Sequence, residues 1–467
     1  MTAAALTLLA SNVASATGGR ILAGDPSSPV GRIVIDSRAV GAGDCFVAIK
    51  GERLDGHSFA RTAIAAGASS VIVQDAAAAR DASAIVIQVD DTTAALQSLA
   101  RHVRRESGAR VVAITGSAGK TTTKEICAEL LSARYRVFRN KGNLNNHIGL
   151  PLSLLELRSR PEVAVVELGM NHPGEIRALV NIAEPNVRVW TNVGDAHLGF
   201  FASADAIADA KAEILESASA DDVLVANGDD PRIAPRIGAF PGRRVTFGTK
   251  ADADVRATGV EFRGLDGVGA RVHTPTGDFD LSTPLLGSGN LYNVLAATAV
   301  AVTFGVEPGE VAARARGLRA AYHRGELLRL PGGVTLIDDS YNSSPSALKT
   351  SLEVVRAAAG SARKIAVLGE MLELGDHATE LHRACGRAAH AAGVDVLIVA
   401  GGTPARALAD AARAAGMKAG SVVVADDRAA ASEALRQIVR PGDLVLVKGS
   451  RGIGLDTVVD MLKAEFA

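Results

Sequence analysis

Short apolar runs alternate with helical patterns over the first hundred residues of the chain. Runs rich in Val and Ile predict strands at 31–40, 43–51, 69–75 and 84–89. Apolar residues spaced three and four apart predict helices at 58–67 and 93–107. We also expect a first helix with Leu6, Leu9 and Val13 on one face. The alternation of strands and helices predicts a compact α/β unit.

The apolar runs become longer and less interrupted after this unit. They predict strands at 109–115, 162–169, 186–193 and 221–230. Continuous apolar strands are typical of a parallel sheet that helices cover on both faces. Residues 244–286 then alternate polar and apolar positions between turn residues, which predicts a small antiparallel appendage, and a helix follows over 290–305.

A second series of regularly spaced apolar runs occupies the last third of the chain. It predicts strands at 334–340, 364–370, 394–401, 420–426 and 442–450. With helices between them, these strands predict a doubly wound, Rossmann-like sheet. The fold class is therefore α/β. The patterns divide it into a small N-terminal domain (1–106), a central parallel-sheet domain of P-loop type (107–318) and a C-terminal domain (319–467).

Size and charge narrow the classes of function. The chain has 467 residues, which exceeds the usual size of one domain. Its formal net charge is −1, so it lacks the excess of cations with which general nucleic-acid binders follow a phosphate backbone. An anionic ligand must therefore be bound by local donors.

Cysteine usage and the N-terminus indicate the compartment. Cys45, Cys127 and Cys385 lie far apart and form no CxxC pair, which suits a reducing cytoplasm. The first basic residue is Arg20, so the charged start of a secretory signal is missing. No apolar run approaches the length of a membrane span. We expect a cytoplasmic protein that binds neither membrane nor nucleic acid.

The stretch VVAITGSAGKTTT at 111–123 carries the strongest chemical signal. Ile114 stands where the strict phosphate-loop pattern has its first glycine. A buried strand nevertheless leads into a glycine-framed turn and a helix, and amide groups at a helix N-terminus stabilise an anion. Lys120 could reach the phosphates and Thr121 could bind magnesium. The alternative is an ordinary strand-to-helix turn with a solvated lysine.

Three further residues follow predicted strands of the central sheet. Glu167 ends one strand, and His197 follows the next, so both are expected at the carboxyl edge where ligands bind. Lys211 lies in the helix after His197. Each also has an ordinary interpretation, namely a solvated or capping glutamate, a structural histidine and an exposed helix lysine.

Paired asparagines and histidines complete the candidates. Asn290 and Asn293 share one helix face and could hydrogen-bond an adenine edge, although Asn290 could equally cap the helix. His377 and His382 lie five apart with no acid between them, so they form no zinc motif and are expected at the surface.

Taken in order, the segments of this chain resemble those of the Mur ligase family. The resemblance covers nearly the whole chain. It rests on DSR at 36–38, FVAIKGERLDGHSFA at 46–60, TGSAGKTTTKE at 115–125, KGNLNNHIGLPLSLL at 141–155, VVELGMNHPGEI at 165–176, NVGDAHLGFF at 192–201, AKAEIL at 210–215, GNLYN at 289–293, IDDSYNSSP at 337–345, VLGEMLELG at 367–375 and LVKGSRG at 446–452.

The resemblance implies an ATP site. Its phosphate loop would comprise Thr115, Gly116, Ser117, Ala118, Gly119, Lys120, Thr121 and Thr122. Asn290 and Asn293 would contact adenine, Arg324 the γ-phosphate, and Asp338 or Asp339 the ribose. Two departures stand out: His323 precedes Arg324 where relatives more often have glycine, and Gly289 replaces a frequent histidine.

The resemblance also implies two magnesium ions. Thr121 and Glu167 would bind one ion, and Glu167, His197 and Lys211 the other, with Lys211 carbamylated. Carbamylation would turn a repelling ammonium into an anionic oxygen ligand. The implied catalytic residues are Lys120, Glu167, His197, Lys211 and Arg324.

Other segments resemble substrate sites. Ser37, Arg38 and Lys50 would contact a UDP-sugar in the N-terminal domain, whereas Asn145 and Asn146 would position the acceptor near its reacting end.

The implied activity is an ATP-dependent ligase of peptidoglycan precursor synthesis, which adds D-alanyl-D-alanine to UDP-N-acetylmuramoyl-tripeptide through an acyl phosphate. A monomer is expected. Two alternatives remain: a sibling ligase that adds diaminopimelate or lysine, and a P-loop regulatory or motor NTPase without ligase chemistry. The segments IDDSYNSSP and NLNNHIGLP favour the D-alanyl-D-alanine ligase.

Overall fold

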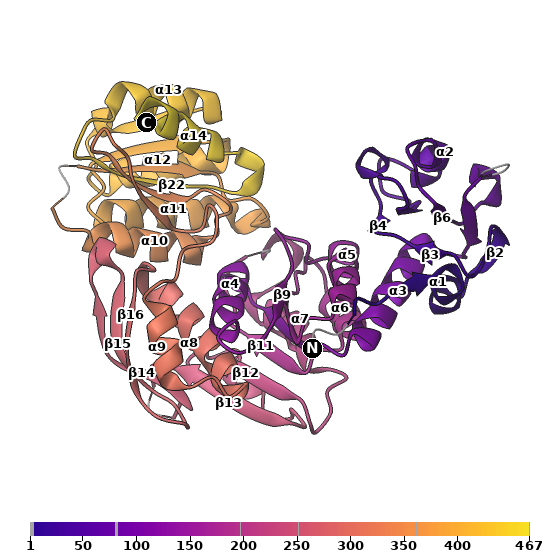
Figure 1. The fold of residues 1–467 in the computed structure, drawn as a ribbon. Helices are drawn as coiled ribbons and strands as arrows, with labels where there is room; N and C mark the ends of the chain where they lie inside the picture. Colours follow the sequence, from indigo (N-terminus) through magenta and orange to yellow (C-terminus); the bar gives the residue numbers. More distant parts are fainter. Residues whose placement is uncertain (1–3, 80–82, 197, 251, 361–362, 467) are drawn as a thin grey trace. The chain divides into compact units, whose positions relative to one another are not determined.

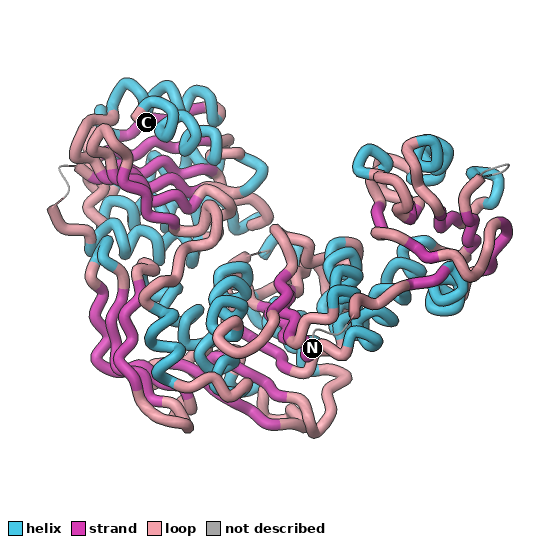
Figure 2. Tube along the Cα trace, in the orientation of Figure 1, coloured by secondary structure: helices cyan, strands magenta, loops and turns pink. Residues whose placement is uncertain are grey.

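The computed structural model describes residues 4–79, 83–196, 198–250, 252–360 and 363–466. The chain forms two compact units, Met1–Ala113 with Tyr135–Arg188, and Ile114–Arg134 with Val189–Ala467. Strands and covering helices mix within each unit (Figures 1 and 2), which confirms the predicted α/β class.

A five-stranded sheet in the order β2-β7-β6-β5-β4 organises the start of the first unit. Its strands are β2 (Arg20–Ala23), β4 (Ile33–Val34), β5 (Cys45–Val47), β6 (Ser70–Val73) and β7 (Ile85–Gln88). Strands β4 to β7 are parallel, whereas β2 pairs antiparallel with β7. The four predicted strands are confirmed, and the mostly exposed edge strand β2 was not predicted.

The predicted first helix is partly wrong. Leu8–Leu9 form a short strand, β1, that pairs with β3 (Pro29–Val30), and helix α1 begins only at Ala10 and ends at Thr17. Leu9 is extended, and its amide donates to the Asn12 side chain at 2.9 Å. This local cap starts the helix after Leu9, so the apolar spacing alone placed the start too early.

Helices α2 (Ala60–Ala65) and α3 (Thr92–Ser107) confirm the other two helix predictions in this region. Helix α3 begins where the Asp91 side chain accepts the amides of Thr93 and Ala94, and it ends at Gly108 in the left-handed conformation.

The same unit contains a further group of elements that carries candidate residues. They are strands β9 (Val137–Arg139) and β10 (Val163–Glu167) and helices α5 (Gly149–Leu155) and α6 (Glu175–Ala183). Strands β9 and β10 are parallel, and β10 is buried along its whole length. Strand β8 (Arg110–Thr115) leaves this unit and ends at the glycine-framed turn.

The second unit includes the end of β8, the glycine-framed turn and the helix after it, α4 (Lys120–Leu131). Strands that follow are β11 (Val187–Trp190), β12 (Val223–Asn227), β13 (Arg243–Gly248), β14 (Val255–Phe262), β15 (Val268–His273) and β16 (Phe279–Thr283). Strands β14 to β16 are antiparallel, which confirms that part of the predicted appendage. Strand β13 pairs parallel with β12 and β14, so the prediction of an antiparallel appendage from residue 244 begins too early. Helices α7 (Ala204–Ala212), α8 (Gly287–Thr303) and α9 (Pro308–Ala315) accompany them.

A six-stranded sheet in the order β17-β18-β22-β19-β20-β21 follows in the same unit. Its strands are β17 (Glu326–Arg329), β18 (Thr335–Asp339), β19 (Lys364–Gly369), β20 (Val396–Ala400), β21 (Val422–Ala425) and β22 (Leu444–Lys448). All pairings are parallel except that of β17 with β18.

Helices cover both faces of this sheet, as the doubly wound prediction requires (Figure 1). One apolar cluster joins α10 (Pro345–Ala357), α11 (Ala378–Ala391) and α12 (Thr403–Ala414) to the strands. A second cluster joins α13 (Arg428–Ile438) and α14 (Asp456–Glu465) to them. Among the described residues, no helix is long and apolar enough to cross a bilayer.

The surface prediction for His382 is wrong. Its side chain is buried in α11, where Nε2 accepts the Met371 amide at 2.9 Å and Nδ1 donates to the Ala378 carbonyl at 2.7 Å. Burial lowers the pKa of His382 because it disfavours the charged ring. His377 is exposed, as predicted.

Candidate active site

The glycine-framed turn is shaped by its immediate neighbours. A Cβ atom at Gly116 would lie 2.0 Å from Thr191 Oγ1, and one at Gly119 would lie 2.3 Å from Asn293 Oδ1. Gly119 also has φ +79°, which favours glycine. Glycine is therefore required at both positions, because larger residues would push the turn away from β11 and α8.

The loop after β11 holds this turn through Asn192. The Ala118 amide donates to Asn192 Oδ1 at 2.9 Å, and Asn192 Nδ2 donates back to the Ala118 carbonyl at 2.9 Å. The Ser117 amide donates to the Asn192 carbonyl at 3.1 Å. Two amides of the turn are thus used within the protein, and the donors best placed for an anion are those at the N-terminus of α4.

Sequence reasoning missed Asn192. The one feature of the sequence that could have pointed to Asn192 is its position directly after a buried strand, at the carboxyl edge of the sheet. Lys120 lies at the start of α4, and its Nζ donates to the Gly116 carbonyl at 2.8 Å.

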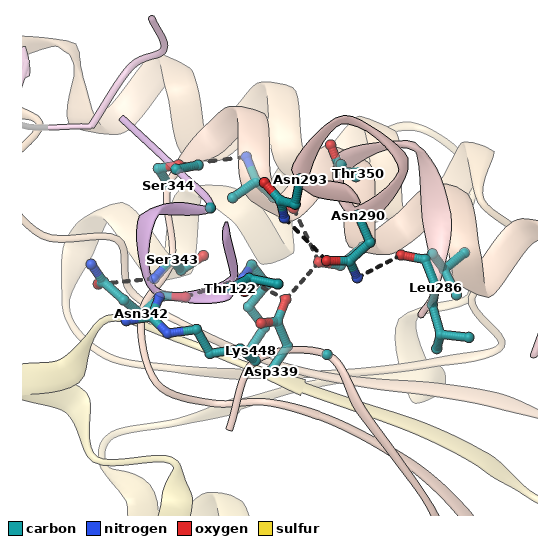
Figure 3. A pocket seen from close by; sticks show the side chains of 18 of the residues that line it. Thr122, Leu286, Asn290, Asn293, Asp339, Asn342, Ser343, Ser344, Thr350 and Lys448 are labelled. Atoms are coloured by element: carbon teal, nitrogen blue, oxygen red, sulfur yellow. Dashed lines mark hydrogen bonds and ion pairs between the residues drawn. The ribbon is translucent and has the colours of Figure 1, made fainter. Parts of the chain in front are cut away.

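A cavity of ≈ 200 Å³ opens beside the turn (Figure 3). Predicted nucleotide residues from four segments line it: Ser117, Ala118, Gly119, Thr122, Asn290, Asn293, Arg324 and Asp339. Five others do not line it, namely Thr115, Gly116, Lys120, Thr121 and Asp338. Residues far apart in sequence therefore share one cavity within the second unit.

The two asparagines of α8 form a connected pair in this cavity. Asn293 Nδ2 donates to Asn290 Oδ1 at 3.1 Å, and Thr123 Oγ1 donates to Asn293 Oδ1 at 3.2 Å. Asn290 Nδ2 donates to the Leu286 carbonyl at 2.9 Å, as Figure 3 shows. The helix begins at Gly287, and no side chain caps it. The capping interpretation of Asn290 is therefore wrong.

The aspartate doublet divides between two environments. Asp339 lines the cavity, where it accepts Lys448 Nζ at 2.6 Å (Figure 3). It also accepts Ser351 Oγ at 2.8 Å. Asp338 is fully buried behind it. Lys448, at the end of β22, was not among the predicted site residues. The feature that could have pointed to it is a lysine that ends a buried apolar run.

Arg324 approaches the cavity from the segment before β17. Its guanidinium lies 4.0 Å from the centre of the Tyr341 ring, a cation–π contact. Among the residues that the structure describes, no carboxylate forms an ion pair with Arg324. This cation is therefore suited to an anionic ligand.

Lys211, in the last turn of α7, is buried, so the interpretation as an exposed lysine is wrong. Burial lowers its pKa well below the usual value, and the positive charge of Lys120 lowers it further. Within the described part of the chain, no carboxylate forms an ion pair with Lys211. Burial and the neighbouring cation both favour the neutral amine, which is the nucleophilic form.

Glu167 and Asn145 lie together in the first unit. Glu167 ends β10 and is buried, and Asn145 Nδ2 donates to its Oε1 atom. Asn146 instead accepts the Gly149 amide at 2.8 Å at the start of α5. The predicted ligand His197 lies outside the described residues. Among those described, no three His, Cys, Asp or Glu side chains form a metal-binding group.

The predicted sugar-site residues follow neighbouring parallel strands. Ser37 and Arg38 come after β4, and Lys50 comes after β5. Arg38 forms two hydrogen bonds with the Asp36 carboxylate and lowers its pKa to about 2. The carboxyl ends of parallel strands share one sheet edge, so the three residues follow strands that end at the same edge.

Comparison with known proteins identifies the same segments. Three family models match: the Mur ligase family catalytic domain at 29–104, the Mur ligase middle domain at 114–301, and the Mur ligase glutamate ligase domain at 323–451. The UDP-N-acetylmuramoyl-tripeptide--D-alanyl-D-alanine ligase of Bacillus subtilis is 35% identical over 91% of this chain and 92% of its own.

Solved structures are similar over nearly the whole chain. A crystal structure of MurF from Acinetobacter baumannii has a TM-score of 0.89 and 32% identity, and covers 99% of this chain and 100% of that one. MurF ligase from Thermotoga maritima in complex with ADP has a TM-score of 0.81 and 32% identity, with 93% and 97% covered. The chain belongs to the Mur ligase family.

Proposed function

We propose that this protein joins D-alanyl-D-alanine to UDP-N-acetylmuramoyl-tripeptide and converts ATP to ADP and phosphate. The observation that carries this proposal is the single cavity shared by the glycine-framed turn, the asparagines of α8, Arg324 and Asp339. Similarity to ligases of this specificity over almost the entire chain supports the choice of substrates. Membership of the ligase family argues against a regulatory or motor NTPase.

The cavity suits ATP chemically. Asn290 and Asn293 would offer amide groups to the adenine edge, and Asp339 would accept a ribose hydroxyl. The N-terminus of α4 and Lys120 would bind the phosphates, and Arg324 would approach the γ-phosphate. The resemblance left open which aspartate contacts the nucleotide. We infer Asp339, because Asp338 does not line the cavity.

The proposed magnesium ligands are oxygen and nitrogen donors of suitable type. Thr121 and Glu167 would hold one ion, and Glu167, His197 and Lys211 the second. An ammonium at Lys211 would not fit a cation site, whereas a carbamate would. Magnesium, when bound, offsets negative charge on phosphate and carboxylate oxygens.

The lowered pKa of Lys211 makes this modification chemically reasonable. Its neutral nitrogen would attack the carbon of CO₂, so that an N–C bond forms, one C=O π bond becomes a carboxylate oxygen, and the nitrogen releases a proton. The product is an anion beside Lys120, which replaces cation repulsion by attraction.

Ligation requires an activated carboxylate, because direct expulsion of oxide is prohibitive. The tripeptide carboxylate oxygen attacks the γ-phosphorus, the bond to the bridging oxygen breaks, and ADP leaves with the electron pair. The amine of D-alanyl-D-alanine then attacks the acyl carbon, and the tetrahedral intermediate expels phosphate and loses a proton. Lys120 and Arg324 would stabilise charge on the transferred group.

The remaining assignments complete the proposal. Ser37, Arg38 and Lys50 would bind the UDP-sugar, Asn145 and Asn146 would position the acceptor, and the domains would comprise 1–106, 107–318 and 319–467. The family models match within these ranges. A cytoplasmic location fits a nucleotide-linked substrate. A monomer is part of the same proposal.

The test measures ADP release by the purified protein with UDP-N-acetylmuramoyl-tripeptide, ATP and magnesium. D-alanyl-D-alanine should support turnover, whereas free diaminopimelate or lysine should not. Reactions without an amine supply the background. Turnover with a free diamino acid and none with D-alanyl-D-alanine would identify a sibling ligase instead.

A further inference from the structure

We propose that His323 and Asp338 form a buried pair whose role is to position Arg324 at the nucleotide cavity. The inference rests on the proposed function, because it assigns a task to the cation expected at the γ-phosphate. His323 and Asp338 are positioning residues, since neither lines the cavity.

The backbone at His323 is unusual. Its φ is +58°, in the left-handed region that glycine and asparagine adopt most easily. The side chain is nonetheless 3% exposed, so this conformation is maintained inside the protein rather than at a solvent-exposed turn. A residue held in a rare conformation must be fixed by its surroundings.

The His323 ring contacts the Asp338 carboxylate and lies 3.5 Å, between ring centroids, from the Tyr322 ring. His323 Nδ1 lies 2.6 Å from Asp338 Oδ2, and Asp338 is 0% exposed. Its other oxygen accepts the Ser340 hydroxyl at 2.7 Å and the Ser340 amide at 3.3 Å. Lys463 Nζ lies 3.9 Å from Oδ2. Both oxygens of Asp338 are therefore occupied within the protein, as suits an anchor.

The pair fixes the residue that follows it. The His323 carbonyl accepts the Tyr341 amide at 3.2 Å, and the Arg324 guanidinium lies over the ring of the same tyrosine. Tyr341 thus contacts both the backbone that precedes Arg324 and the Arg324 guanidinium. Both contacts connect Arg324 to β18 and the segment after it, which also supply Asp339 to the cavity.

A double-mutant cycle tests this role. We expect His323→Ala to weaken binding of a non-hydrolysable ATP analogue and to raise KM for ATP, each about tenfold, the scale of coupling between neighbouring residues. The same substitution made in Arg324→Ala protein should change neither value further, because its effect passes through Arg324. Equal losses in both backgrounds would overturn the proposal.

Two further variants separate positioning from folding. His323→Asn tolerates the left-handed backbone and keeps a donor for Asp338, so it should retain most of the affinity; a loss as large as that of alanine would contradict the role of the pair. His273→Ala is the matched control, because His273 Nδ1 lies 2.8 Å from Asp278 on the β15–β16 hairpin and does not line the cavity. It should leave nucleotide binding unchanged.

Calorimetric binding of the analogue needs no acceptor. A wrong choice of amine substrate would therefore leave this measurement intact, and failure of the cycle would leave the assignment of D-alanyl-D-alanine intact. If His323→Ala unfolds, as its melting temperature will show, the cycle is carried out with Asp338→Asn, which removes the carboxylate at the other end of the pair. Asp338→Asn should then weaken analogue binding in the wild type and not in Arg324→Ala protein, and equal losses in both would overturn the proposal.

Discussion

Two buried lysines of the second unit have opposite surroundings. Lys448, at the end of β22, forms an ion pair with Asp339 at 2.6 Å and donates to the Asn342 carbonyl at 3.1 Å. Lys211, in α7, is equally removed from water, but the charge that acts on it is the positive charge of Lys120.

Lys448 has the surroundings of a structural ammonium, whereas Lys211 has those of a reactive amine. A buried ammonium is tolerated when a carboxylate and further acceptors compensate for lost hydration, as at Lys448. Without them burial favours the neutral amine, and the pKa of Lys211 is lowered in this direction. An unprotonated amine can be modified, whereas an ion-paired ammonium cannot react in that way.

The largest effect is expected at Lys211. Lys211→Ala should lower ligation on the order of 10³-fold, because it removes a group proposed to hold metal at the reaction centre. Short-chain carboxylic acids should restore part of the activity by supplying the missing oxygens. Steady-state ADP release measures both effects, and the exposed Lys418→Ala is the control. Full activity in Lys211→Ala would exclude Lys211 from the site.

The next largest effect is expected on the stability of variants at Lys448. Lys448→Met should lower the free energy of unfolding by ~3 kcal/mol, because it leaves Asp339 partly buried without its cation. Lys211→Met should cost little, since no ion pair is broken there. Denaturant titration of both variants checks this order. A larger loss at Lys211 would reverse the comparison.

A smaller effect is expected at Asn192. Asn192→Ala removes two hydrogen bonds to Ala118, each contributing about 1 kcal/mol, and should weaken ADP binding by roughly tenfold to thirtyfold. Asn12→Ala, which removes a local cap in the first unit, is the control. Unchanged calorimetric affinity for ADP in Asn192→Ala would show that the turn keeps its shape without this residue.

The smallest effect concerns pH. Because burial depresses the pKa of His382 in the folded state, the unfolded chain binds a proton first as pH falls. Stability should therefore decrease as pH drops through ~6.5, the ordinary histidine pKa, towards the lower folded value. His382→Gln should show a shallower decrease in denaturation experiments than the wild type. The exposed His377→Gln should keep the wild-type slope.

Sequence patterns predicted most strands because buried parallel strands are continuous apolar runs. Strands β2 and β17 escaped notice because their residues are partly or largely exposed, so neither shows a clear pattern. Local capping by Asn12 shifted the first helix in a way that apolar spacing does not reveal.

The candidate site was predictable only in part. The glycines and the lysine of the turn indicate a phosphate loop because they lie between a buried strand and a helix. Asn192 has no such local signal, because its partner Ala118 lies 74 residues away in the sequence. The burial of Lys211 depends on tertiary packing that its own helix does not encode. Resemblance to relatives, rather than periodicity, pointed to that residue.

The contacts of Gly116 and Gly119 carry an evolutionary consequence. The missing side chain at position 119 leaves the space that Asn293 occupies, and the one at 116 leaves space for Thr191. A substitution at either glycine therefore requires a second substitution at the residue it faces. Homologues with alanine at position 119 should have a shorter side chain at position 293. Sequence covariation between these positions would then record, across the family, a contact that joins the turn to the helix carrying the asparagines.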